Sequence, residues 1–238
     1  MKSSPVRLPR LLAALCCLLL LAAAPARAQD EGGVVRSTAD YVYGQTMRFN
    51  LSATGIGQVR AITLYFRLGA SADSFAVDIA VPDGPQIDVS YALDLTQTRL
   101  PPFTAVTYWW DVVRAEDTLI VPEQVISYTD DQFNWSQLVE TDEEGGGSVR
   151  IHWTGEGTRL GEQARDLVFE MLLRLGPLLP VERVLPFDVY IYPSMADLGA
   201  ALRLAGRDFQ PGQTYPELGV VLATVVNPET AESELRRD

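Results

Sequence analysis

The sequence predicts two domains of different class, an all-β sandwich followed by part of an α/β domain. Three observations lead to this prediction. Apolar and polar residues alternate with the period of a β-strand through residues 34–129. Apolar residues recur at helical spacing only after residue 158. An acidic, glycine-rich run at residues 141–147 separates the two patterns.

The first 28 residues have the features of an export signal. Lys2, Arg7 and Arg10 are basic, and the apolar run that follows at residues 11–24 is too short to cross a bilayer of about 30 Å comfortably. Ala26-Arg27-Ala28 then fits the small-x-small pattern of signal peptidase sites. We predict a signal peptide at residues 1–28 and a secreted mature chain. A retained anchor is the alternative, in which the uncleaved signal would be the chain's only membrane contact.

The mature chain would be strongly acidic. Cleavage after Ala28 removes four basic residues and no acidic ones, which lowers the net charge from −12 to −16. This charge argues against nucleic acid and anionic membranes as partners. Both cysteines leave with the signal peptide, and His152 is the only histidine. The composition therefore excludes disulfides and a multi-histidine zinc site, and a Ser-His-Asp triad would have to use His152.

Residues 29–130 predict an immunoglobulin-like or fibronectin-like β-sandwich. Short alternating runs are separated by Gly- and Pro-rich turns, as expected for a sandwich of about 100 residues. The alternating runs are 47–53, 62–68, 75–81, 87–95, 106–112 and 125–128. Residues 131–147 lead up to and include the acidic, glycine-rich run, so we predict a solvated linker there.

Residues 148–238 alternate strands and helices, which predicts an α/β domain. Ser194 is a predicted N-cap, with Asp197 in the capping-box position. The chain ends at Asp238 without a C-capping residue, so we expect this domain to be partial. The predicted order is strand 149–153, helix 158–175, strand 187–192, helix 194–206, strand 218–226 and a helix from residue 227.

Six stretches carry a family resemblance: 103–111, 128–135, 149–153, 189–198, 215–222 and 234–237. They resemble exported bacterial peptidase-MA-like proteins, which are zinc metallohydrolases of the gluzincin type and often carry a β-sandwich before the peptidase domain. The resemblance implies a gluzincin-like N-terminal subdomain at 148–238. It also implies a peptide or protein substrate for the full-length relative.

The family's catalytic signature is absent. Its chemistry requires a His-Glu-x-x-His helix that binds zinc and activates water, and no residue here matches that motif. In the relatives, the motif begins a few residues after the stretch that resembles 234–237. The resemblance therefore implies a truncated chain without catalytic residues, metal ligands or a cofactor of its own, whereas a full-length relative would bind zinc.

One substrate contact is implied by the resemblance. Gluzincins hold the substrate backbone by β-addition to an edge strand beside the active-site helix. The resemblance places Gly219, Val220, Val221 and Leu222 in that strand. The alternative is an ordinary buried strand.

Other functions stay open. The main rival is a non-enzymatic extracellular binding or adhesion protein with an immunoglobulin-like domain. A carbohydrate-binding module rests on the pair Trp109 and Trp110, of which one should face the sandwich core because neighbouring strand residues point to opposite faces. His152 is expected on the polar face of its strand, in a structural or surface role.

Overall fold

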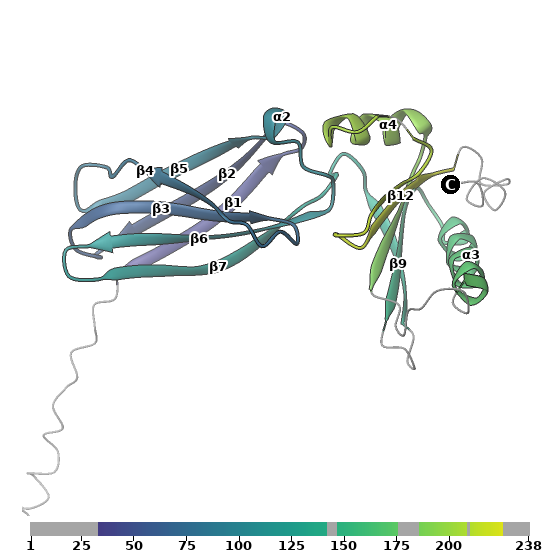
Figure 1. Ribbon diagram of the computed structural model, residues 1–238, viewed down its shortest axis with the longest axis horizontal. Coiled ribbons are helices and arrows are strands. Elements are labelled where there is room, and N and C mark those ends of the chain that lie inside the picture. The colour runs from purple at the N-terminus through teal and green to yellow at the C-terminus, as the bar shows by residue number, and fades with distance from the viewer. Residues whose placement is uncertain (1–32, 142–146, 176–185, 209, 226–238) are drawn as a thin grey trace, which may run out of the picture.

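The computed structural model describes residues 33–141, 147–175, 186–208 and 210–225. The predicted signal peptide and the predicted helix from residue 227 lie outside these ranges. Two domains follow each other along the long axis of the molecule (Figure 1). Within the described ranges, no helix has both the length and the apolar character needed to cross a membrane.

The first domain is a sandwich of two antiparallel sheets. One sheet contains β1 (Val34–Val42), β2 (Thr46–Thr54) and β5 (Gln86–Asp94), in the order β1-β2-β5. The other contains β3 (Val59–Leu68), β4 (Phe75–Ile79), β6 (Thr104–Arg114) and β7 (Thr118–Tyr128), in the order β4-β3-β6-β7. A short helix, α2 (Leu95–Thr98), follows β5. This arrangement confirms the prediction of a β-sandwich.

Alternation determines which side chains fill the sandwich. Met47, Phe49 and Leu51 of β2 are buried, and so are Leu64 of β3 and Trp110 of β6 in the facing sheet. Because successive side chains of a strand point to opposite faces, the residues between these positions form the outer faces of the two sheets.

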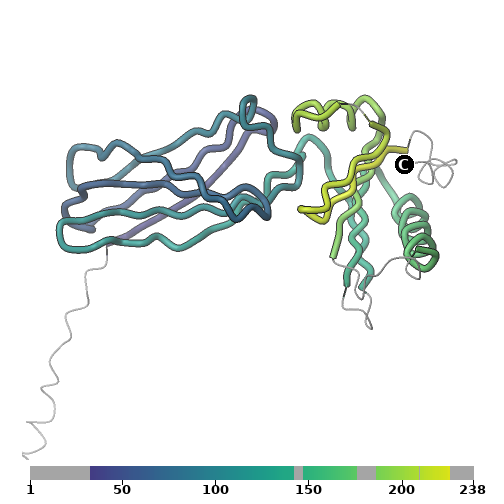
Figure 2. Tube along the Cα trace, viewed as in Figure 1, coloured from purple at the N-terminus to yellow at the C-terminus, as the bar shows by residue number. Residues whose placement is uncertain are grey.

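The second domain is built on a five-stranded mixed sheet in the order β11-β12-β10-β9-β8. β9, β10 and β12 are parallel, and the two outer strands are antiparallel to their neighbours. The strands are β8 (Trp135–Thr141), β9 (Ser148–Thr154), β10 (Phe187–Tyr192), β11 (Gln213–Tyr215) and β12 (Val220–Thr224). Figure 2 follows the chain through this sheet.

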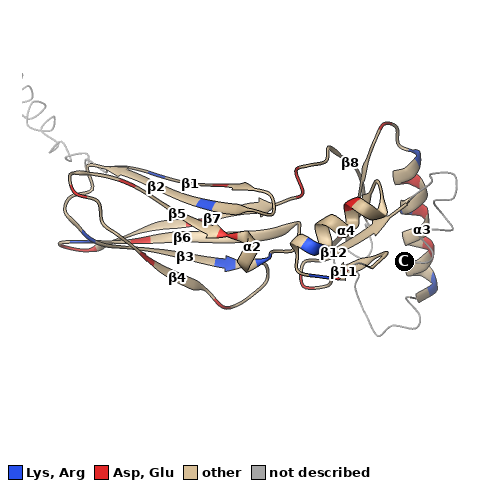
Figure 3. Cartoon of the chain, turned by 90° about the horizontal axis from the view of Figure 1, so that it is seen from above, with Lys and Arg blue, Asp and Glu red and all other residues tan. Residues whose placement is uncertain are grey.

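Two helices cover opposite faces of the five-stranded sheet. α3 (Arg159–Leu175) packs on the face that carries Ile151 and Trp153, and its Gly161 lies against the indole ring of Trp153. α4 (Met195–Leu204) packs on the other face. Its N-cap is Ser194, whose hydroxyl accepts a hydrogen bond from the Asp197 amide, as predicted. Charged residues recur along α3 (Figure 3).

The predicted linker at 131–147 was largely wrong. Trp135–Thr141 form β8, which pairs with β9 along its whole length. This strand has a weak apolar pattern because its two sides pack on different clusters, Trp135 on one face and Leu138 on the other. Residues 142–146 lie outside the described ranges.

The two domains meet at a buried cluster of tyrosines around Asp130. The Tyr192 hydroxyl donates to the Asp130 carboxylate at 3.0 Å, and Tyr43 stacks on Tyr128 at 5.1 Å. Burial raises the pKa values of Asp130, Tyr43 and Tyr192. A second contact joins Phe103, which has a left-handed backbone (φ 67°), to the ring of Tyr190 at 3.4 Å.

Candidate functional site

The outer face of the four-stranded sheet combines aromatic, apolar and charged side chains. We call it the aromatic face. Ile120 and Val125 are 65% and 64% exposed on it. Its residues are Ala76 and Asp78 of β4; Thr63, Tyr65 and Arg67 of β3; Thr107, Trp109 and Asp111 of β6; and Ile120, Glu123 and Val125 of β7.

Tyr65 and Trp109 form the centre of the aromatic face. They lie opposite each other on β3 and β6, and their rings stack with centroids 5.3 Å apart and planes 7° from parallel. The Arg67 guanidinium lies 5.2 Å from the centroid of the Trp109 ring. The same guanidinium donates two hydrogen bonds to Glu123, at 2.9 and 3.0 Å. The ion pair with Glu123 holds the cation beside the indole, where the ring's quadrupole attracts it.

The outer face of the three-stranded sheet has a different composition, and we call it the polar face. Its middle rows are Arg36, Ser52 and Asp88; Thr38, Asn50 and Ser90; and Asp40, Arg48 and Ala92. Its end rows begin with Val34 and Val42, which are 73% and 55% exposed. No aromatic residue occurs among these positions. A sheet face that only meets solvent carries such polar residues. The two outer faces therefore differ in their aromatic residues, whereas both carry exposed apolar residues.

The structure places the two neighbouring tryptophans as expected, one in and one out. Trp110 is fully buried in the sandwich core, and its indole N–H donates to the Ser37 hydroxyl at 3.1 Å. Trp109 is half-buried on the aromatic face. Sequence reasoning did not select Tyr65, Arg67 or Glu123. The alternation in β3 could have placed Tyr65 and Arg67 on the outer face, but their pairing with β6 and β7 required the sheet order.

His152 lies in the second domain, far from the aromatic face in sequence and fold. It is 8% exposed and points to the face opposite Ile151 and Trp153, as predicted. Its Nε2 is 2.7 Å from Oδ1 of Asp188, and its ring stacks on Tyr190 at 4.1 Å. It therefore has a structural role in a buried polar cluster.

Asp188 is the centre of that cluster. Arg150 donates two hydrogen bonds to its carboxylate, at 2.6 and 2.7 Å. Burial alone would raise the pKa of Asp188, but the hydrogen bonds from Arg150 and His152 outweigh it and lower the pKa to about 2. The ionised carboxylate thus stabilises the folded sheet.

Gly219, Val220, Val221 and Leu222 do not lie at the sheet edge, and that part of the prediction was wrong. Tyr215 to Gly219 form a turn that returns the chain on itself, so β11 pairs with Val220–Leu222 and takes the edge position. β10 pairs with the other side of β12. Val220, Val221 and Leu222 thus fit the alternative, an ordinary internal strand, Gly219 lies in the turn before it, and the backbone edge on this side of the sheet belongs to β11. Substrate contact at these residues stays a prediction.

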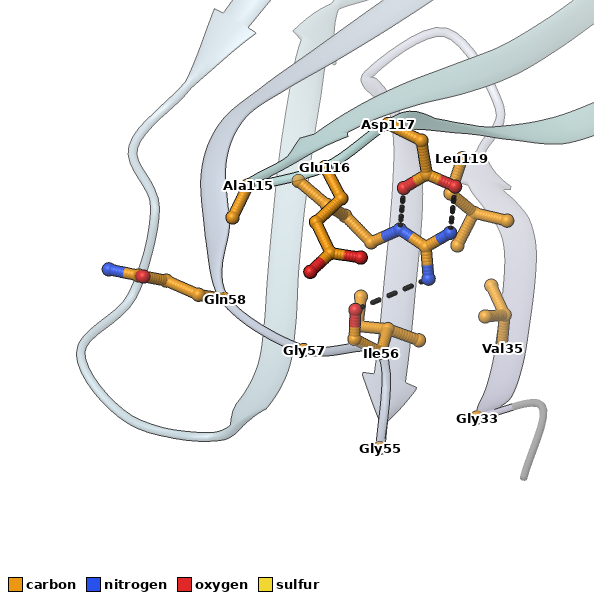
Figure 4. A pocket seen from close by; sticks show the side chains of 11 residues that line it. Gly33, Val35, Gly55, Ile56, Gly57, Gln58, Ala115, Glu116, Asp117 and Leu119 are labelled. Carbon is orange, nitrogen blue, oxygen red and sulfur yellow. Dashed lines mark hydrogen bonds and ion pairs between the residues drawn. The ribbon is translucent and has the colours of Figure 1, made fainter. Parts of the chain in front are cut away.

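Two cavities lie away from the aromatic face. A groove of about 330 Å³ runs between α3 and the sheet, and Met171, Leu175, Val221 and Leu222 are among its mostly apolar lining residues. A larger, open cavity of about 810 Å³ occupies the end of the sandwich near Gly33 (Figure 4). Its Arg114 is bound to Asp117 and to the Ile56 carbonyl.

The described residues form no zinc-binding site. They contain no group of three or more His, Cys, Asp or Glu side chains placed to hold a metal ion. The single histidine is already bound to Asp188. We therefore derive no metal-dependent chemistry for this part of the chain.

No family model matches the chain, and no curated protein matches it. Several solved structures are similar to part of this chain. A bromine derivative of a family 56 carbohydrate-binding module is 5% identical, with a TM-score of 0.30 over 39% of this chain and 90% of that chain. A β-1,3-glucan-binding domain of the same module family is 10% identical, with a TM-score of 0.26 over 39% and 98%.

A family 64 laminaripentaose-producing β-1,3-glucanase from Paenibacillus barengoltzii is 13% identical, with a TM-score of 0.27 over 52% of this chain and 28% of that chain. Similarities with such low TM-scores support no statement about the fold or the ligand of this chain.

Proposed function

We propose that this chain is a non-enzymatic extracellular binding protein whose sandwich binds a carbohydrate on the aromatic face. The observation that carries the proposal is the Tyr65–Trp109 stack, flanked by Arg67 and Glu123, on one outer face of the sandwich, whereas the other outer face has no aromatic residue at its paired positions.

The chemistry of the aromatic face suits a sugar. A pyranose ring presents C–H groups on its faces and hydroxyls around its rim, so it needs apolar surface with hydrogen-bonding groups beside it. Trp109 and Tyr65 supply aromatic surface, and Ile120 and Val125 extend the apolar area. Carboxylates of the same face can accept hydrogen bonds, and threonine hydroxyls can both accept and donate them.

The first test compares Trp109→Ala with the unchanged protein. Truncation of the indole removes the central ring of the surface, so we expect polysaccharide affinity to fall about tenfold or more. Affinity electrophoresis against a panel of neutral and anionic soluble polysaccharides measures this loss. Thermal unfolding of the variant should remain cooperative, because Trp109 lies outside the sandwich core.

Two arginines provide a matched control. Arg67→Ala removes a guanidinium from the aromatic face, whereas Arg48→Ala removes one from the polar face, where it is paired with Asp40 at 3.9 Å. We expect Arg67→Ala to weaken polysaccharide binding and Arg48→Ala to leave it unchanged. If no polysaccharide in the panel binds, or if both arginine variants bind equally well, the proposal is refuted.

We also propose, as a second candidate, that the chain is the N-terminal part of a peptidase-MA-like zinc metallopeptidase. The favouring observation is the apolar groove between α3 and β12, together with the antiparallel edge strand β11 beside it. An extended peptide could add to β11, and a further helix could fill the groove. A gene that continues in frame beyond codon 238 and encodes His-Glu-x-x-His would support this candidate. A stop codon followed by no such frame would contradict it.

A further inference from the structure

We propose that the ligand of the aromatic face is an internal stretch of a neutral polysaccharide, and not an anionic polymer or a chain end. This inference rests on the proposed carbohydrate-binding function and specifies its ligand class. Two independent features carry it, the charge of the aromatic face and its shape.

The charge of the face argues against anionic sugars. Among its residues, Arg67 is the only cation, and its Nη2 is already paired with both carboxylate oxygens of Glu123. Asp78 and Asp111 add two further carboxylates. A uronate, sulfate or phosphate group placed on this face would meet net negative charge at close range. The net charge of −12 for the whole chain adds repulsion at longer range.

The same carboxylates favour neutral sugars. Asp78 accepts a hydrogen bond from the Thr63 hydroxyl at 3.0 Å and keeps other lone pairs for a ligand. Each carboxylate oxygen can accept hydrogen bonds from vicinal sugar hydroxyls, and hydrogen bonds to an ionised acceptor are stronger than those between neutral groups. Neutral polyols therefore gain from Asp78 and Asp111, whereas polyanions are repelled by them.

The shape of the face favours the middle of a polymer over its end. Its central row crosses the four strands from Ala76 through Tyr65 and Trp109 to Glu123, a width of about 14 Å at the usual strand spacing. β4 and β7 are the edge strands of this sheet, so the row runs out to both sheet edges. The cavities described above lie elsewhere. A polymer can thus pass across the row and continue beyond it at both sides.

The experiment uses polymers that differ only in charge or in their ends. Soluble β-glucan, mannan and dextran serve as neutral probes, and the carboxymethylated form of each backbone serves as its anionic counterpart. We expect at least one neutral polymer to bind and its carboxymethylated form to bind about tenfold more weakly at low ionic strength. This difference in affinity should become smaller as salt is added, and it should also become smaller in the variants Asp78→Asn and Asp111→Asn.

A second pair of probes tests the chain end. Borohydride reduction opens the terminal ring of the bound polymer and leaves its internal residues unchanged. Equal affinity for the reduced and unreduced polymer excludes the reducing end as the ligand, and a loss of affinity on reduction overturns internal binding.

The outcomes separate this inference from the proposed function. If carboxymethylated polymer binds as well as neutral polymer in the unchanged protein but not in Trp109→Ala, the ligand class is wrong and the aromatic face still binds carbohydrate. If no polymer of either charge binds, or if Trp109→Ala binds all of them normally, both proposals fail.

Discussion

At the scale of single residues, two neighbouring tryptophans of β6 point to opposite faces of their sheet. The register of β6 directs Trp110 into the core and leaves Trp109 outside, half-buried beside Tyr65. The sequence predicts that the two rings diverge, because strand residues alternate. Which ring faces out depends on the neighbouring core positions. Val106, Tyr108 and Val112 are buried and share the side of Trp110.

Asp188 yields a prediction at the same scale. Its pKa of about 2 lies below the ordinary value of 3.8, so its ionised form stabilises the fold above that value. This contribution is lost as the pH falls from about 4 through about 2, because both the folded and unfolded chains then bind the proton. We expect Asp188→Asn to lower the free energy of unfolding at pH 7 by at most about 2 kcal/mol, reduced by solvent screening.

Urea unfolding at pH 7 and near pH 2 measures this effect. The difference in free energy of unfolding between the variant and the unchanged protein should be smaller at the lower pH. Asp166→Asn is the matched control, since Asp166 also pairs with an arginine but is 69% exposed, and it should change little at either pH. If Asp188→Asn lowered the free energy of unfolding equally at both pH values, the lowered pKa of Asp188 would be contradicted.

At the scale of elements, α3 and β10 could be predicted from their patterns, whereas β11 and the first half of β7 could not. α3 was expected at 158–175 and forms at Arg159–Leu175, and β10 lies at the expected residues. β11 has only three residues, too few for a periodic signal, and its presence changed the sheet edge. The first half of β7 was missed because Pro122 interrupts the pattern, which is tolerated where a strand lies at the edge of a sheet and has a bulge.

The contact between α3 and β9 gives an element-scale prediction. A Cβ atom added at Gly161 would collide with the indole ring of Trp153, which is itself fixed by a hydrogen bond to the Gly157 carbonyl. Alanine favours a helix over glycine by about 1 kcal/mol, but overpacking of this kind costs about 1–3 kcal/mol. We therefore expect Gly161→Ala to destabilise the second domain.

Thermal unfolding checks this expectation against a control on the same helix. Leu173 is 78% exposed, so Leu173→Ala should leave the transition almost unchanged. A Gly161→Ala protein that melts higher than the unchanged protein would mean that α3 can move away from Trp153 without loss.

At the scale of the whole molecule, the two domains share one buried cluster. Asp130 leaves the sandwich directly after β7, and its carboxylate meets Tyr192 of the second domain. Sequence reasoning ended the sandwich at this residue but could not foresee the contact, because the partners are 62 residues apart. The aromatic face is equally non-local, since it combines four strands. The sequence alone predicts only the alternation within each strand.

Asp130 supports a prediction about the junction. Burial raises its pKa, so the folded protein holds the proton more tightly than the unfolded chain does. The ionised carboxylate then costs stability once the pH rises above the ordinary value of 3.8. We expect Asp130→Asn to match or exceed the unchanged protein in stability at pH 7, and to lose that advantage near pH 3.

Urea unfolding measures the free energy of unfolding of the variant and of the unchanged protein. It is carried out at the two pH values and monitored in both domains. Tyr192→Phe is the companion variant. It removes the hydroxyl that bonds Asp130 and should destabilise the junction by about 1–3 kcal/mol at pH 7. A large loss for Asp130→Asn at pH 7 would show that the charge itself holds the domains together.

The course of the chain through the sandwich also determines how the molecule would respond to a pulling force. The chain enters β1 at the end of the sandwich away from the second domain and leaves β7 at the junction (Figure 1). Tension between the two ends of the molecule would thus act along the strands. β1 pairs with β2 at all nine of its residues, so its hydrogen bonds would be sheared together and would not open one after another. A sandwich loaded in this direction is a stiff tether, about 30 Å long by the rise of a nine-residue strand, between whatever precedes it and the domain it carries.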